Sequence, residues 1–200
     1  MASAYALAVT NGGYGQTVTT SRPVVAVLFG GRSSEHSISC LSAASVLAAI
    51  DRADYDVVAV AIARDGRMFV HSGDTSILAK NGDVLPEVLP TGQQVVLSTD
   101  PSIRGFVSTD GSQLPSLYQS VDVVFPVLHG PYGEDGTIQG ALEFAQLPCV
   151  GSGVFASAAA MDKTHMKAMF VAHGLPVGAF EVVTSTQWHQ SPDACRAVSY

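Results

Sequence analysis

The chain has 200 residues, of which 47% are hydrophobic and 14% charged, so it can bury the core of a globular domain. With 10 basic and 17 acidic residues the formal charge is −7, which argues against nucleic acid or an anionic membrane surface as a partner. No apolar run reaches the roughly 18 residues that a membrane span requires. The three cysteines are too widely spaced for a disulfide framework or a zinc site, so we expect free thiols in a cytoplasmic protein.

The start of the chain predicts one strand–helix–strand unit. Residues 1–22 lack the basic start of a signal peptide, and we expect them to form a flexible extension. The continuous apolar, mostly β-branched run Val24–Phe29 predicts a buried parallel strand. Apolar residues then recur at helical spacing over Ser33–Ile50, with Ser33 or Ser34 available as N-cap. A second buried strand is expected over Tyr55–Ala63.

The rest of the chain alternates between weak and strong patterns. Residues 64–120 hold short strand candidates among Gly, Pro, Asp and Ser, so we expect an irregular insertion with a few edge strands. The later predicted elements are a strand over 121–130, helices over 137–146, 154–160 and 161–174, a strand over 177–185 and at most one helix after it. This order predicts an α/β fold with an open parallel sheet, in which ligands bind at the carboxyl ends of the strands.

The first strand ends in a glycine turn that precedes a helix. A dinucleotide-binding loop needs G-x-G-x-x-G there, but the stretch from Gly30 to Glu35 lacks the second spaced glycine and the last one. A carboxylate about 4 Å from a phosphate charge would cost roughly 4 kcal/mol at an effective dielectric near 20. The helix N-terminus offers only about 0.3–1 kcal/mol in return. We therefore expect no pyrophosphate at this turn.

Two roles remain open for Glu35. Acidic residues are favoured in the first turn of a helix, so capping alone is sufficient to explain it. Alternatively, a carboxylate raised on a glycine turn at the ligand edge suits a cation such as the ammonium group of an amino acid. The neighbouring His36 is expected to lie on the helix surface.

A second loop, His129–Gly136, follows another buried strand and should reach the same edge of the sheet. His129 is equally compatible with a structural role and with ligand contact. The loop glycines could turn backbone amides toward a ligand. Together the loops could clamp a zwitterion, with its amine at Glu35 and its carboxylate at His129. The other polar loop residues are expected mainly to brace the loop: Tyr132, Glu134 and Asp135.

Lys163 lies beside Asp162 in the first turn of a predicted helix. A lysine at this place opposes the helix dipole, which is mild evidence for contact with an anion. The alternative is a solvated surface lysine.

Three stretches together resemble the D-alanine–D-alanine ligase family: VLFGGRSSEHSISCLSAASV, VFPVLHGPYGEDGTIQGALE and VGSGVFASAAAMDKTHMK. The resemblance covers about residues 23–183 and rests on long motifs. It implies an ATP-grasp protein of three domains, of which the first is Rossmann-like.

The resemblance also implies a reaction and site residues. ATP phosphorylates the carboxylate of a first D-alanine, and the amine of a second attacks the acyl phosphate to give the dipeptide for peptidoglycan. Mg²⁺ supports the phosphoryl transfer. Glu35, in the GG-x-S-x-E motif, would hold the first ammonium group. His129, in the HG-x-x-GEDG motif, would lie with Gly130 near that substrate's carboxylate, and Lys163, in the MDK motif, would contact ATP phosphates.

The sequence departs from the family in its length, because family members are considerably longer and their metal ligands would follow Tyr200. We therefore expect no metal ligand here. The expected division is an extension over 1–22, the N-terminal α/β domain over 23–160 and an incomplete start of the ATP-grasp central domain over 161–200. The chain is then an N-terminal part of a ligase; the alternative is an inactive fragment or a D-alanine-binding module. The resemblance adds a homodimer as an expected assembly.

Overall fold

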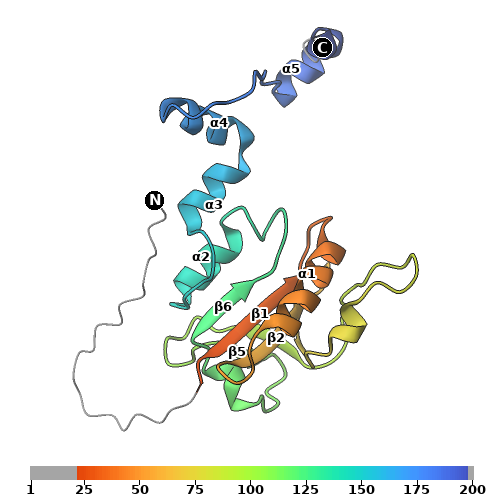
Figure 1. The fold of residues 1–200 in the computed structure, drawn as a ribbon, viewed down its shortest axis with the longest axis vertical. Helices are drawn as coiled ribbons and strands as arrows, with labels where there is room; N and C mark the ends of the chain where they lie inside the picture. Colours follow the sequence, from red (N-terminus) through yellow and green to blue (C-terminus); the bar gives the residue numbers. More distant parts are fainter. Residues whose placement is uncertain (1–21, 198–200) are drawn as a thin grey trace, which may run out of the picture.

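The computed structural model describes residues 22–197, which form a six-stranded sheet followed by a run of helices (Figure 1). The strand order is β5-β4-β3-β2-β1-β6. The predicted extension over residues 1–22 lies outside the described residues except for Arg22.

The parallel half of the sheet confirms the predicted strand–helix–strand unit. Strand β1 (Val24–Gly30) pairs in parallel with β2 (Asp56–Ile62) on one side and with β6 (Val123–Pro126) on the other. Helix α1 (His36–Ala49) connects β1 to β2. The carboxyl ends of these three strands therefore meet at one edge, where the two predicted loops begin.

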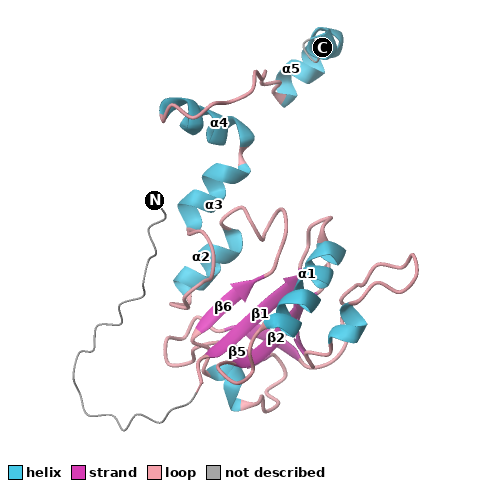
Figure 2. Cartoon of the chain, viewed as in Figure 1, coloured by secondary structure: helices cyan, strands magenta, loops and turns pink. Residues whose placement is uncertain are grey.

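The insertion adds three antiparallel strands to the same sheet (Figure 2). Strand β3 (Met68–His71) pairs with β2, β4 (Gln94–Leu97) with β3, and β5 (Phe106–Ser108) with β4. The short strand candidates are confirmed, but the sheet is mixed rather than parallel throughout. The reason is the short turn after β2, since such a turn reverses the chain and permits only an antiparallel neighbour. Two short 3₁₀ helices complete this part: η1 (Thr75–Leu78) and η2 (Ser116–Gln119).

Both faces of the sheet are buried at its strand β1, which explains the continuous apolar pattern of that strand. Val25, Val27 and Phe29 pack on the face covered by α1. Ala26 and Leu28 pack on the opposite face, against helix α2 (Thr137–Phe144). The sheet is thus the middle layer of three, and its central strand fixes the position of the glycine turn that follows it.

Beyond α2 the chain continues in helices that lead away from the sheet (Figure 1). These are α3 (Val154–Met161), α4 (Lys163–Ala172), α5 (Ser185–Gln190) and α6 (Pro192–Ala197). Helix α4 ends in a glycine cap, because Gly174 has φ +71° and the Leu175 amide bonds to the Phe170 carbonyl. No helix among the described residues is long and apolar enough to cross a membrane.

The predicted strand over 177–185 is wrong. The segment between α4 and α5 contains no strand, and the tail forms two short helices instead of at most one. A strand requires a neighbour for its backbone donors and acceptors, and no strand among residues 22–197 lies alongside this segment. Apolar, β-branched residues alone were therefore not enough to make a strand here.

Cys40 is the most protected thiol and gives a chemical test of the α1–sheet packing. The residue has no exposed surface, and its burial raises the pKa of the thiol to about 11. At pH 8 only about 0.1% of such a thiol is the reactive thiolate. We expect iodoacetamide at pH 8 to modify the partly exposed Cys195 well before Cys40, as measured by peptide mass spectrometry, and urea to remove the difference. Equal labelling in the native protein would contradict this packing.

Candidate functional site

The turn after β1 depends on two consecutive glycines. Gly30 and Gly31 have φ values of +89° and +92°, a region that favours glycine. A Cβ on Gly30 would lie 2.3 Å from the Ile62 carbonyl oxygen, so a side chain has no room there. The turn therefore brings the start of α1 directly against the ends of β1 and β2.

The amides of this turn are already used within the protein. The Gly30 amide donates to Ser39 Oγ at 2.8 Å, and the Gly31 amide donates to the Ile62 carbonyl at 2.8 Å. A phosphate-binding loop needs such amides to be free for the anion. The structure thus gives a second reason, besides repulsion from Glu35, why this turn is not a phosphate site.

Glu35 occupies the N-cap position of α1, but its side-chain carboxylate does not bond to the amides of the helix start. The residue is exposed, and its side chain makes no capping hydrogen bond. The prediction that Ser33 or Ser34 is the N-cap is wrong, because α1 begins only at His36. Ser33 Oγ instead accepts the Glu35 amide at 3.1 Å. The capping explanation for the carboxylate of Glu35 therefore loses its support, and the carboxylate is available for a ligand.

His36 is not on the helix surface, which corrects the expectation from the sequence. Its side chain has no exposed area. Nδ1 lies 2.6 Å from the Gly31 carbonyl oxygen, and Nε2 accepts the Val88 amide at 3.0 Å. The helix turns this residue inward because its first turn packs against the insertion, a contact that helical spacing alone does not predict.

The two predicted loops meet, and Ser33 joins them. Its hydroxyl donates to the His129 carbonyl at 2.7 Å while accepting the Glu35 amide. A second link is the 3.0 Å hydrogen bond between His129 Nε2 and Ser42 Oγ of α1. A Cβ built on Gly130 would lie 3.5 Å from Glu35 Oε2, so the carboxylate is next to the second loop. The structure therefore brings Glu35, His129 and Gly130 together, as the sequence predicted.

Sequence reasoning did not identify Ser33 and Ser42 as parts of this arrangement. The sequence predicts Ser33 only as a helix cap, although its position between the glycines and Glu35 is a usable signal. Ser42 lies mid-helix and gave no local signal.

Two of the three glycine amides that were predicted to face a ligand, those of Gly130 and Gly133, are bonded within the second loop. The Gly130 amide donates to Glu134 Oε2 at 2.7 Å, and the Gly133 amide donates to the Gly130 carbonyl at 3.1 Å. The loop folds back on itself, and this engages the amides of Gly130 and Gly133. Glu134 therefore braces the loop, as expected. Asp135 does so as well, because its carboxylate accepts the amides of Tyr132 and Thr137.

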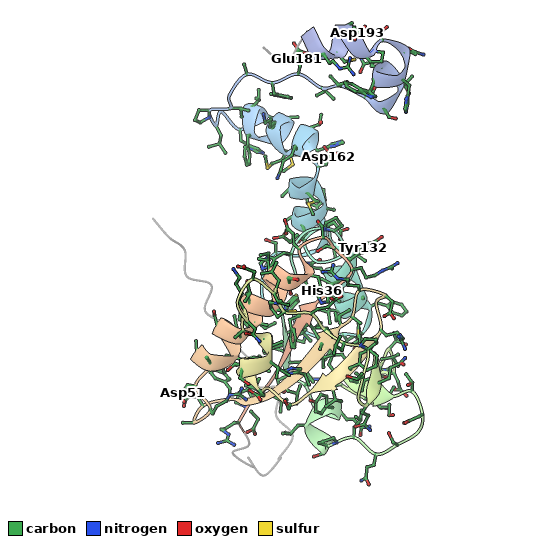
Figure 3. All side chains as sticks on the ribbon, turned by 90° about the vertical axis from the view of Figure 1, so that its right-hand side faces the viewer. His36, Asp51, Tyr132, Asp162, Glu181 and Asp193 are labelled. Atoms are coloured by element: carbon green, nitrogen blue, oxygen red, sulfur yellow. The ribbon has the colours of Figure 1, made fainter. Side chains whose placement is uncertain are left out.

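A cavity of about 190 Å³ lies between the two loops. It is lined by residues of both loops, by Ile62 at the end of β2 and by Ile138 of α2. Pockets for drug-sized ligands usually measure about 300–1,000 Å³, so this space suits a smaller molecule. At its rim the Arg32 guanidinium lies 4.8 Å from the centre of the Tyr132 ring, which adds a contact between the loops. Figure 3 shows His36 and Tyr132 at this end of the sheet and Asp51 at the opposite end.

Lys163 is not brought to the two loops. It is exposed at the start of α4, and Figure 3 shows the adjacent Asp162 well away from His36. Asp162 Oδ1 accepts the amides of Thr164 and His165, so these amides are not free for a phosphate. The exposed Lys163 side chain still remains for an anion. Within residues 22–197 no group of three or more His, Cys, Asp or Glu side chains is placed to hold a metal ion.

Comparison with known proteins identifies the family that the chain resembles. The family model described as "D-ala D-ala ligase N-terminus" matches residues 24–152. The D-alanine–D-alanine ligase of Rhodococcus erythropolis is 56% identical over 162 residues, covering 80% of this chain and 44% of the relative. That of Paenarthrobacter aurescens is 48% identical over 180 residues, covering 90% and 48%. The chain thus spans about half the length of the curated relatives it matches.

Solved structures show the same relationship. The VanG D-Ala:D-Ser ligase of Enterococcus faecalis superposes with a TM-score of 0.69 at 29% identity, covering 88% of this chain and 49% of that one. The D-alanine–D-alanine ligase of Coxiella burnetii gives 0.66 at 27% identity, with coverage of 88% and 49%. Because the family model spans the sheet, both loops and α2, the chain belongs to the D-alanine–D-alanine ligase family.

Proposed function

We propose that this chain supplies the part of an ATP-dependent D-alanine–D-alanine ligase that recognises the first D-alanine. The observation that carries the proposal is the carboxylate of Glu35. It is exposed, makes no capping bond, and is presented beside Gly130 on a turn whose two glycine amides are already engaged. An unpaired carboxylate of this kind can accept charge-assisted hydrogen bonds from an ammonium group.

The second loop supports the other end of the same substrate. His129 lines the small cavity, and its ring is hydrogen-bonded through Nε2 to Ser42 Oγ. In the proposed complex Glu35 binds the ammonium group and His129 lies near the carboxylate. Gly130 contributes the close approach between the loops rather than a free amide. These groups orient the substrate, and positioning of this kind lowers the barrier for a reaction between two bound partners.

The proposal that ATP and Mg²⁺ take part rests on the family resemblance alone. ATP would supply the phosphoryl group that activates the D-alanine carboxylate, and Lys163 is the residue proposed to contact its phosphates. The described residues provide no cluster that fits Mg²⁺, so no step is assigned to a metal ligand here. We also propose a domain boundary near residue 160, because the buried core ends before α3 and no residue of α4 is buried.

The location and assembly of the protein are proposals of the same kind. Cys40, Cys149 and Cys195 are free thiols in the structure, which is compatible with the reducing cytoplasm. A homodimer is proposed on the family resemblance, and analytical ultracentrifugation of the chain would test it.

A chimera tests the proposed function directly. We would replace the matching 162-residue region of the Rhodococcus erythropolis ligase by the corresponding residues of this chain, with which it is 56% identical. We expect the chimera to release phosphate from ATP only when D-alanine and Mg²⁺ are both present, and to form D-alanyl-D-alanine. Phosphate release and dipeptide would be measured in parallel.

The controls separate recognition from folding. L-alanine should give no dipeptide with the chimera, and the 200-residue chain alone should give no phosphate release with D-alanine. A chimera that folds, as judged by circular dichroism and its melting temperature, but makes no dipeptide would count against the proposed function. A chain that turns over ATP alone would show that it contains more of the catalytic machinery than we propose.

A further inference from the structure

We propose that His36 is a positioning residue, which ties the glycine turn below Glu35 to the insertion segment around Val88 and so holds the ammonium-binding carboxylate in place. This inference rests on the proposed function of Glu35. It assigns a role to the segment around Val88, for which the sequence predicted no function. His36 has no exposed surface, so it acts through Glu35 and does not touch the substrate itself.

The hydrogen bonds of His36 fix its protonation pattern. The Val88 backbone N–H can only donate, so Nε2 must accept, and the ring proton therefore sits on Nδ1. Nδ1–H then donates to the Gly31 carbonyl, 2.6 Å away. One neutral imidazole thus connects the Gly31 carbonyl to the amide of Val88, which lies 52 residues after His36 in the chain.

The ring fits closely into the turn. A Cβ on Gly30 would lie 3.1 Å from His36 Cε1 and 3.0 Å from Val88 Cγ2. Glycine at this position therefore makes room for the imidazole as well as for the Ile62 carbonyl. Because Glu35 directly precedes His36, the same contacts restrict the backbone from which the carboxylate projects.

A second link runs parallel to the first. Arg64 Nε donates to Glu87 Oε1 at 2.8 Å, and Arg64 Nη1 reaches the Ser33 carbonyl at 3.5 Å. Glu87 is therefore linked through Arg64 to the carbonyl of Ser33, and Val88 is linked through His36 to the carbonyl of Gly31. The pair Arg64–Glu87 is half exposed, whereas His36 is fully buried, so we assign the larger share of the bracing to His36.

Two substitutions by amide side chains separate the two hydrogen bonds of His36. His36→Asn keeps an amide donor near the place of Nδ1 but loses the acceptor for Val88, whereas His36→Gln keeps an acceptor near Nε2 but loses the donor to Gly31. Since the brace needs both bonds in one side chain, we expect each variant of the chimera to raise the KM for D-alanine about two- to tenfold. The KM for ATP should stay within about twofold, because Lys163 lies outside this turn.

The matched control is His173→Asn, which alters an exposed histidine at the end of α4. It should leave both KM values unchanged. If the His36 variants lower the melting temperature but leave the KM for D-alanine unchanged, His36 is merely structural and the proposal is overturned. If the unmodified chimera makes no dipeptide, the proposed function fails instead.

Nitrogen NMR of the histidine rings in the 200-residue chain gives a test that needs no folded variant. We expect the His36 ring to be neutral, with its proton on Nδ1 and an acceptor-type Nε2. A proton on Nε2 would contradict the bond to Val88 and overturn the brace, whatever the ligase assays give.

Discussion

Replacement of Glu35 by glutamine should lower kcat/KM for D-alanine in the chimeric ligase by about 10- to 100-fold. The substitution preserves the size of the side chain but removes the negative charge that the ammonium group requires. Hydrogen bonds to charged groups contribute about 1.5–3 kcal/mol, which corresponds to the expected loss. Initial rates of phosphate release at varied D-alanine concentration would measure the effect.

The folded state should be almost unaffected by this substitution, which makes the result interpretable. Glu35 is exposed and makes no capping bond, so Glu35→Gln should leave the melting temperature within about 2 °C of the unmodified protein. The matched control is Glu143→Gln, at an exposed glutamate of α2, which should change neither quantity. Unchanged kinetics for Glu35→Gln would remove the ammonium-binding role and leave Glu35 as a surface residue beside a turn.

The parts of the fold that the sequence predicted are those governed by short-range periodicity. The apolar run of β1, the helical spacing of α1 and the glycines between them are local patterns, and the structure confirms each of them. The meeting of the two loops followed from topology, because parallel strands place their carboxyl ends at one edge. Exclusion of a phosphate from the turn followed from the charge of Glu35, and the engaged amides of Gly30 and Gly31 strengthen it.

The parts that could not be predicted depend on contacts distant in sequence. His36 has the position of a surface residue by helical spacing, and only the contact with Val88 explains its burial. The Gly130 amide was expected to face a ligand, but it donates to the carboxylate of Glu134. The sequence does not show which acceptor a loop amide will bind. The segment over 177–185 had strand composition without a strand beside it.

Substitution of Gly30 by alanine should strongly destabilise the fold. A residue other than glycine pays about 1–2 kcal/mol for a φ of +89°. The added Cβ would also lie 2.3 Å from the Ile62 carbonyl oxygen, and overpacking of this kind costs about 1–3 kcal/mol. The sum, about 2–5 kcal/mol, should lower the melting temperature of the 200-residue chain by about 4–20 °C.

Substitutions at two other glycines separate the two causes of this loss of stability, the positive φ and the contact with the Ile62 carbonyl. Gly73 has φ +80° but open space around its Cβ position, so Gly73→Ala should cost only the conformational part, about 1–2 kcal/mol. Gly178 has open space and no positive φ, so Gly178→Ala should be neutral within about 0.5 kcal/mol. If Gly30→Ala and Gly73→Ala lower the melting temperature equally, the close approach of Ile62 is not limiting. If Gly30→Ala is the worse of the two, the carbonyl that also accepts the Gly31 amide has been displaced, and the turn that carries Glu35 must move with it.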